Sequence, residues 1–167
     1  MQSVLIPAER VNVLIGTGGA TKRFIEKRSK CKITIEESEV FVEGESFDEW
    51  IAKEVVHAIG RGFNPEKALM LLTDGYTFEY VEMSEFAGTP KARARLKGRL
   101  IGEAGRTRKF IERNTGAMMC VYGKTVAFIG SFEAVASAKE AALMLLSGSR
   151  HAAVYKHLEK NKPTLSG

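Results

Sequence analysis

Hydrophobic positions in the first half of the chain follow a fixed order of strand-like and helix-like spacings. An apolar stretch at residues 4–6 predicts a strand, and a short helix is expected to follow it and to end at Ile15. A second helix carries Phe24, and two strands are then expected at residues 32–35 and 40–42. This half closes with a long helix in which apolar residues recur at every fourth position.

The second half of the chain repeats this order. Alternation at residues 77–81 predicts a strand, and a helix is expected to end at Ile101. Strands at residues 119–122 and 126–129 are joined by Gly123-Lys124, a pair that is typical of a two-residue hairpin. A long amphipathic helix again closes the half. The pattern therefore predicts the order β-α-α-β-β-α twice.

An internal repeat supports this interpretation. Residues 15–26 match residues 101–112 at an offset of 86, and the match continues without a gap to Gly44 and Gly130. Nine of these thirty positions are identical, and they fall mainly on glycines and on apolar residues such as the Phe-Ile pair. Backbone geometry and core packing both constrain such positions, so we interpret the repeat as two copies of one structural unit.

A helix stop and a new helix start separate the two copies. Residues 60–63 end the first copy, and Asn64 followed by Pro65 is typical of a helix N-cap with proline at the first helical position. Apolar residues 68–72 are assigned to this added helix, and a last amphipathic helix is expected around residues 153–158. We expect an α+β fold with two domains at residues 1–74 and 75–167. Each domain is predicted to have a three-stranded antiparallel sheet with helices packed on one face.

Charge is shared unevenly between the two halves of the chain. The 167 residues carry a net charge of +5, but residues 1–83 hold ten Lys/Arg against fourteen Asp/Glu. Residues 84–167 hold fifteen against six, which is a net charge of +9. Such a basic half indicates an anionic partner, and a merely solvated basic surface is the alternative.

The composition argues against several classes of protein. The longest apolar stretch, residues 141–146, is too short to span a bilayer, and no targeting signal is visible at residues 1–6. Two cysteines cannot form a disulfide framework, so we expect a reduced, cytoplasmic protein with no membrane partner. The three histidines have no metal-ligand spacing. We therefore expect neither a metal nor another cofactor.

Each copy places a Gly-x-x-Gly loop between two helices, at residues 16–19 and 102–105. Glycine lets the backbone approach a phosphodiester closely, and the N-terminus of the next helix offers free N–H donors and a positive dipole. Two such loops in matching contexts predict binding of single-stranded nucleic acid, and a structural turn in a protein-binding module is the alternative. Walker and dinucleotide motifs need further residues that both loops lack. No catalytic set is present, so we expect no enzyme activity.

The predicted RNA-binding residues are the two loops, basic residues near them, and apolar residues of the strands that follow. They are Gly16, Thr17, Gly18, Gly19, Lys22, Arg23, Ile33, Ile35, Lys97, Arg99, Gly102, Glu103, Ala104, Gly105, Arg106, Arg108, Lys109 and Val121. Basic residues are expected to attract phosphates, and apolar residues are expected to receive bases. Val13, Leu100 and Tyr122 are further apolar candidates, with core packing as the alternative for every apolar position. Phe47 and Trp50 are expected in the core, and the two cysteines are expected to be buried strand residues.

At several stretches the sequence resembles a known family. They are residues 59–68, 97–102, 106–109, 121–126 and 151–159. The family is that of the archaeal two-KH-domain proteins related to the eukaryotic partner of the Nob endonuclease, with kinship to the Krr-type assembly proteins. The resemblance covers nearly the whole chain and implies two tandem type I KH domains, whose Gly-x-x-Gly loops clamp single-stranded RNA.

This resemblance also implies a role. Such proteins are non-catalytic adaptors of small ribosomal subunit biogenesis that bind the 3′ region of small-subunit rRNA. They hold assembly proteins there, such as an endonuclease of the Nob type. The chain departs from the family pattern at Glu103-Ala104, where a basic residue is more usual. Two alternatives stay open: an accessory subunit of an RNA-processing, RNA-degrading or transcription complex, and a protein-binding module with vestigial glycine loops.

Overall fold

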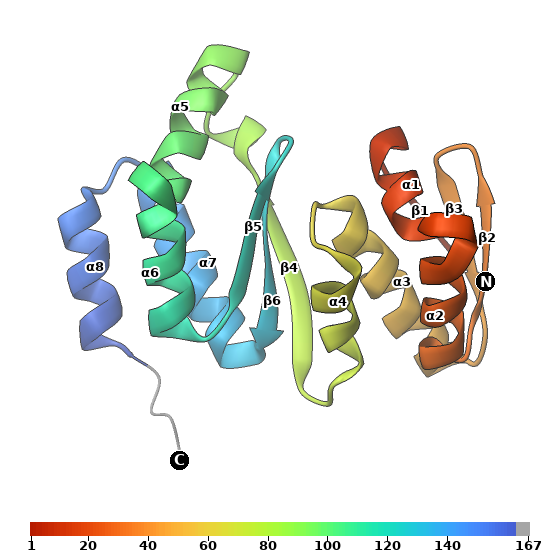
Figure 1. Cartoon of the computed structure of the whole chain (residues 1–167). Helices are drawn as coiled ribbons and strands as arrows, with labels where there is room; N and C mark the ends of the chain where they lie inside the picture. The colour runs from red at the N-terminus through yellow and green to blue at the C-terminus, as the bar shows by residue number, and fades with distance from the viewer. Residues whose placement is uncertain (163–167) are drawn as a thin grey trace. The chain divides into compact units, whose positions relative to one another are not determined.

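The computed structural model of the chain describes residues 1–162, which fold into two compact units. Unit 1 comprises Met1–Asp74, and unit 2 begins at Gly75. Each unit contains the same six elements in the same order, followed by an additional helical segment (Figure 1). The α+β fold with two three-stranded sheets, predicted from the hydrophobic pattern, is confirmed.

Unit 1 is built on an antiparallel sheet in the strand order β1-β3-β2. Its strands are β1 (Gln2–Leu5), β2 (Lys32–Glu36) and β3 (Glu39–Glu43), and its main helices are α1 (Ala8–Ile15), α2 (Ala20–Ser29) and α3 (Ser46–Gly60). Ile33 of β2 pairs with Val42 of β3, and both side chains are buried, as are Leu14, Ile25 and Ile59 of the helices. Thr34, between the apolar positions of β2, is exposed, so the alternation of the strand separates a core face from a solvent face.

Unit 2 repeats this arrangement with the strand order β4-β6-β5. Its strands are β4 (Tyr76–Glu82), β5 (Met118–Tyr122) and β6 (Thr125–Ser131), and its helices are α5 (Pro90–Ile101), α6 (Arg106–Thr115), α7 (Phe132–Leu146) and α8 (His151–Lys160). Helix α8 packs on both α6 and α7 and buries Val154 and Leu158. Each of these side chains contributes about 1.5–3 kcal/mol of burial free energy.

Helix starts follow the capping signals of the sequence. The Asn64 side chain accepts a hydrogen bond from the Lys67 N–H at 2.8 Å, with Pro65 at the first position of α4 (Pro65–Ala68). Thr89 caps α5 in the same way, and its hydroxyl accepts from the Ala92 N–H at 3.1 Å. The predicted helix start at Asn64-Pro65 is confirmed, but α4 is shorter than expected. Residues 69–72 form a 3-10 turn instead of continuing the α-helix.

Two aromatic side chains assigned to the core from the sequence are exposed. Phe47 is 69% exposed and Trp50 is 54% exposed, so this prediction was wrong. The buried residue in the first turn of α3 is Glu49, whose carboxylate accepts a hydrogen bond from the Gly44 N–H at 3.1 Å. A polar contact therefore positions this turn in place of aromatic packing. Apolar burial begins one turn later, at Ala52.

The cysteines only partly match their prediction. Cys31 is buried but lies just before β2, and burial raises the pKa of its thiol above the ordinary value. Cys120 lies in β5 and is half-buried. The two thiols are not joined in a disulfide.

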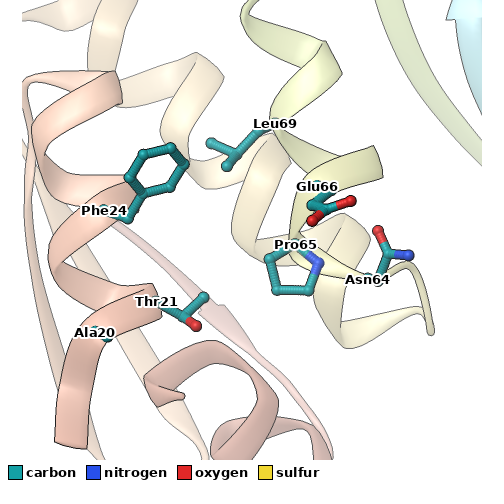
Figure 2. A pocket seen from close by; sticks show the side chains of 7 residues that line it. All are labelled: Ala20, Thr21, Phe24, Asn64, Pro65, Glu66 and Leu69. Atoms are coloured by element: carbon teal, nitrogen blue, oxygen red, sulfur yellow. The ribbon is translucent and has the colours of Figure 1, made fainter. Parts of the chain in front are cut away.

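Short α4 leaves a cavity beside α2. The cavity has a volume of about 640 Å³ and is lined by Ala20, Thr21 and Phe24 of α2, by the first residues of the α4 segment, and by Leu69. Figure 2 shows the Phe24 ring on α2 facing Pro65 and Leu69 across this space. The lining is mostly apolar, and Phe24 itself is 50% exposed.

Candidate nucleic-acid interface

The first glycine loop has a backbone that requires glycine at its start. Gly16 ends α1 with φ 71° and ψ 178°, a conformation that is open essentially to glycine alone. A β-carbon at this position would also lie 2.6 Å from the β-carbon of Thr21. Gly18 and Gly19 follow with φ values of 59° and 80°. The turn between α1 and α2 therefore exposes backbone at Gly18, where a β-carbon would have nothing within 4 Å.

The second loop has the same geometry. Gly102 adopts φ 76° and ψ 169°, and a β-carbon there would lie 2.7 Å from the Thr107 backbone nitrogen. Ala104 occupies the position of Gly18 with φ 55°, and Gly105 occupies that of Gly19 with φ 74°. The small side chain of alanine is thus accommodated in the left-handed conformation. The two loops therefore adopt the same backbone conformation.

Each loop opens directly into a helix whose first N–H groups have no side-chain cap. Gly19 is the N-cap of α2, and Gly105 is the N-cap of α6, both in the left-handed conformation. The N–H of the first helical residue donates to a carbonyl within the loop, from Ala20 to Thr17 and from Arg106 to Glu103. Because no side chain caps the helix, the N–H groups that follow are available to an anion such as a phosphate, which also gains from the helix dipole. Within its own unit, each predicted loop, residues 16–19 or 102–105, therefore forms one turn at the start of a helix, as expected. Their contact with RNA stays a prediction.

Basic residues beside the loops differ between the units. In unit 1 the exposed Arg23 donates a hydrogen bond from Nη1 to the Gly18 carbonyl at 2.9 Å, so its guanidinium lies over the loop. In unit 2 the basic residues nearest the loop are Arg106, at the first position of α6, and Lys109 one turn later. Lys97 is half-buried on α5, and Glu103 is exposed in the loop itself.

Arg99 has a structural role that the sequence did not indicate. Its Nη2 donates a hydrogen bond to the Ser149 carbonyl, and its own carbonyl lies 2.9 Å from Nε2 of His151. These contacts hold the connection between α7 and α8 to the end of α5. A cavity of about 410 Å³ next to the second loop is lined by Arg99 and its neighbours. Its other basic residues include Arg95, Arg106 and His151, of which Arg95 and His151 were not predicted as site residues.

A carboxylate pairs with the basic side chain one turn earlier in both units. Lys22 lies 3.6 Å from Glu26, and Arg108 lies 2.9 Å from Glu112, at positions 86 residues apart. The second oxygen of each carboxylate accepts a hydrogen bond from a strand N–H, from Ile33 at 2.9 Å in unit 1.

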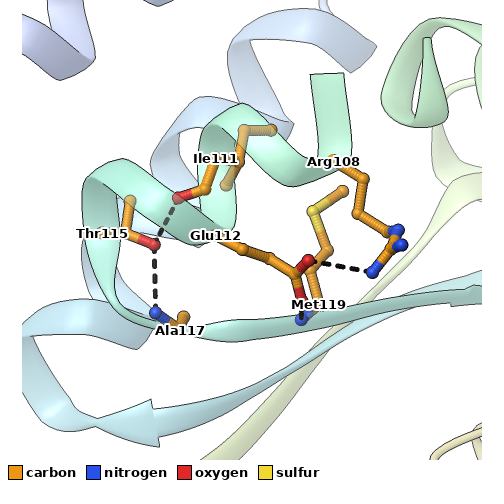
Figure 3. Close-up of polar contacts among 6 residues, drawn as sticks. All are labelled: Arg108, Ile111, Glu112, Thr115, Ala117 and Met119. Atoms are coloured by element: carbon orange, nitrogen blue, oxygen red, sulfur yellow. Dashed lines mark hydrogen bonds and ion pairs between the residues drawn. The ribbon is translucent and has the colours of Figure 1, made fainter. Parts of the chain in front are cut away.

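In unit 2 the Glu112 carboxylate joins helix to strand. Figure 3 shows it between the guanidinium of Arg108 and the start of β5, where the Met119 N–H donates to Oε2 at 3.0 Å. The pair partly neutralises the charge of Arg108 and fixes its direction. The repetition of this carboxylate at an offset of 86 was visible in the sequence, but its pairing role was missed.

The apolar candidates separate into buried and accessible side chains. Ile33 is 1% exposed and Leu100 is completely buried, so both belong to the core and neither can receive a base. Ile35 and Val121, which occupy equivalent positions 86 residues apart, are half-buried on β2 and β5. Both strands are at an edge of their sheets, so one side of each strand has no neighbouring strand. Val13 is also half-buried.

Other kinds of site find no support in the described part of the chain. Within residues 1–162, no group of three or more His, Cys, Asp or Glu side chains could hold a metal ion. In the same residues no helix is long and apolar enough to cross a membrane.

Comparison with known proteins points to one family. Residues 77–163 match the eukaryotic type KH domain, KH-domain type I, and residues 1–58 match the KH domain. The chain is 45% identical over 163 residues to the KH domain-containing protein MJ0443 of Methanocaldococcus jannaschii, a match that covers 94% of this chain and 72% of that protein. It is 30% identical over 106 residues to the pre-rRNA-processing protein PNO1 of Chaetomium thermophilum, covering 62% of this chain and 41% of PNO1.

A solved structure extends the comparison to the whole fold. The chain matches the structure of the a/eIF2alpha-aDim2p-rRNA complex from Pyrococcus horikoshii with a TM-score of 0.91 and 43% identity, covering 96% of this chain and 93% of that chain. Sequence and fold agree over nearly the full length, and both copies of the internal repeat are included. The chain belongs to the Dim2/PNO1-like family of archaeal proteins with two KH domains.

Proposed function

We propose that this chain is a non-catalytic adaptor that binds single-stranded rRNA during maturation of the small ribosomal subunit. One observation carries the proposal: two Gly-x-x-Gly turns share one backbone conformation, and each opens an uncapped helix beside basic side chains. Backbone phosphates of a single strand fit the two turns, because glycine backbone permits close approach and the helix N-termini favour negative charge.

The relatives support rRNA as the ligand. The Pyrococcus structure is that of a complex of aDim2p with rRNA and a/eIF2alpha, and PNO1 is named a pre-rRNA-processing protein. We assign the 3′ region of small-subunit rRNA as the target. A Nob-type endonuclease and an initiation-factor subunit are the proposed protein partners.

The proposal divides the contacts by chemistry. Arg23 in unit 1, and Arg106 and Lys109 in unit 2, lie near the loops and are assigned to phosphates. Ile35 and Val121 are assigned to bases. Lys97 and the paired residues Lys22 and Arg108 are placed at the edge of the interface. Arg99 positions the end of α5 through its hydrogen bonds to the segment between α7 and α8. The net charge of unit 2 (residues 75–167) is +7, which makes it the stronger phosphate binder.

A loop substitution tests the proposal with a control at the same position. Gly18→Asp places a carboxylate beside the phosphate site, whereas Gly18→Ala reproduces what Ala104 already does in the second loop. We expect Gly18→Asp, and Ala104→Asp in unit 2, each to weaken binding of a single-stranded 3′ rRNA fragment at least tenfold, which is about 1.4 kcal/mol.

A control variant and an unrelated RNA complete this test. Gly18→Ala should keep the affinity of the unaltered chain, and circular dichroism should show that all variants are folded. Equal affinity of the two aspartate variants and the unaltered chain would exclude the loops as the RNA site. Equal affinity for an unrelated single strand would reject rRNA as the specific ligand.

A further inference from the structure

The two copies of the repeat differ on the face of α2 and α6 that points away from the paired lysine and arginine. In unit 2 this face is covered. The Tyr155 ring of α8 stacks on Phe110 with centroids 4.1 Å apart and planes at 27°. Its hydroxyl lies 3.0 Å from the hydroxyl of Thr107, which is 2% exposed. An amphipathic helix with a central tyrosine therefore completes unit 2.

In unit 1 the same positions are open. Thr21 and Phe24 stand where Thr107 and Phe110 stand in unit 2, yet Phe24 is 50% exposed. The segment that follows α3, as α8 follows α7, is only the single turn α4 and a 3-10 turn, which pack on α3. The cavity of about 640 Å³ between α2 and α4 is what a longer helix would fill (Figure 2).

This face meets the proposed RNA interface only at the first turn of α2, where Ala20 and Thr21 line the cavity directly after the glycine loop. Lys22 and Glu26 lie on the side of α2 that reaches β2, as the hydrogen bond from Ile33 to Glu26 shows. At about 100° per residue, Thr21 and Phe24 project to the other side of the helix. Beyond this first turn, Phe24 lies on a different side of α2 from the lysine and carboxylate that face β2.

Charge around the cavity defines the ligand further. Lys27 and Arg28 are exposed on the last turn of α2, and the Arg28 guanidinium lies 5.6 Å from the centre of the Phe24 ring. Glu66 is the only charged residue of the lining, and Lys27 and Arg28 lie outside it. A helix whose acidic residues lie over the last turn of α2, away from Glu66, complements this surface, whereas a basic helix such as α8 does not.

We propose that the cavity between α2 and α4 of unit 1 is a docking site for an amphipathic, acidic helix of a partner protein. The helix inserts a tyrosine or phenylalanine that stacks on Phe24, as Tyr155 stacks on Phe110 in unit 2. Aromatic side chains in such pockets dominate the binding energy of protein interfaces. The proposal goes beyond RNA binding and does not depend on it.

A peptide derived from α8 tests the site on the full chain. The probe is residues 149–162 with Lys156→Glu and Lys160→Glu, two positions that are exposed in α8. At up to ~1 mM peptide, we expect shifts of the NMR amide signals of residues 20–24 and 66–68. A probe with Tyr155→Ala, and the unaltered basic peptide, should each bind at least tenfold more weakly.

Two protein variants complete the test. Phe24→Ala should weaken binding at least tenfold, and Phe47→Ala, which removes an exposed aromatic ring from α3, should leave it unchanged. Absence of binding, or equal binding to the Phe24 variant, would overturn the proposal. So would a single-stranded RNA that shifts the amide signals of residues 66–68 when the peptide does not, because the cavity would then belong to the RNA interface.

Discussion

Replacing Gly16 by alanine should destabilise unit 1 far more than the same change at Gly18, two residues away. At Gly16 the backbone has φ 71° and ψ 178°, and holding a non-glycine residue there costs about 1–3 kcal/mol. The new β-carbon would also lie 2.6 Å from the Thr21 β-carbon, and overpacking of this kind costs about 1–3 kcal/mol. Allowing for relaxation of the loop, we expect the free energy of unfolding to fall by about 3 kcal/mol.

Gly18 provides the matched control. Its φ of 59° and ψ of 21° lie in the left-handed region, and a β-carbon there meets nothing within 4 Å. A left-handed alanine costs about 1–2 kcal/mol, and the loss of freedom in the unfolded chain returns about 0.4–1 kcal/mol. The expected net loss is about 1 kcal/mol or less. Ala104 already tolerates this conformation in unit 2.

The single tryptophan makes the measurement specific to unit 1. Trp50 lies on α3, so its fluorescence during urea or thermal unfolding reports on this unit and not on unit 2. For a unit of this size, a loss of about 3 kcal/mol lowers the midpoint by roughly 12–24 °C. If Gly16→Ala and Gly18→Ala unfold within about 2 °C of each other, the argument that Gly16 requires glycine is refuted.

Three further predictions concern charge, thiol reactivity and the last helix. Arg106→Ala should flatten the slope of log affinity against log salt concentration by about 0.7. Arg108→Ala should leave this slope unchanged, because the Arg108 guanidinium is already paired with the Glu112 carboxylate. Equal slopes in salt titrations of the two variants would contradict this prediction. Burial raises the pKa of the Cys31 thiol, so at a pH of about 7.5 iodoacetamide should modify Cys120 first. Modification of Cys31 should accelerate only as the pH rises toward its raised pKa. Mass spectrometry of the native protein measures the order of modification, and the opposite order would contradict the prediction. Tyr155→Ala should destabilise unit 2 by about 2 kcal/mol while the fluorescence transition of unit 1 is unchanged, and circular dichroism that shows no shift would reject the stacking role of this residue.

Local chemistry explains what could be predicted from the sequence. Glycine loops, strand alternation and helix caps depend on residues within a few positions of each other, and the cap at Asn64 formed as expected. The internal repeat added an independent check, since each element had to be consistent with its copy 86 residues later. The fold class followed from these local features together.

Tertiary contacts explain what could not be predicted. The charge of Arg99 predicts a contact with RNA, but its hydrogen bond to Ser149 joins residues fifty positions apart. The alternation of β2 predicts that Ile33 lies on one face of the strand, but it does not indicate whether that face packs against the helices. Phe47 fits the apolar stripe of α3 but is 69% exposed, because the buried residue of that turn is Glu49, which accepts a hydrogen bond from the Gly44 N–H. In each case a distant segment decides the environment of the side chain.

The two units keep the same loop and helix arrangement but surround it with opposite charge. Both have the loop, the uncapped helix and the carboxylate that ties the helix to the edge strand. Net charge is −2 over residues 1–74 and +7 over residues 75–167, so long-range attraction of RNA is concentrated in unit 2. Once unit 2 holds the strand, unit 1 meets it at a high effective concentration and needs little attraction of its own. The open face of α2 in unit 1 is then available to a partner protein. Further positive charge on this face, beyond Lys27 and Arg28, would instead attract RNA to a surface outside the RNA interface.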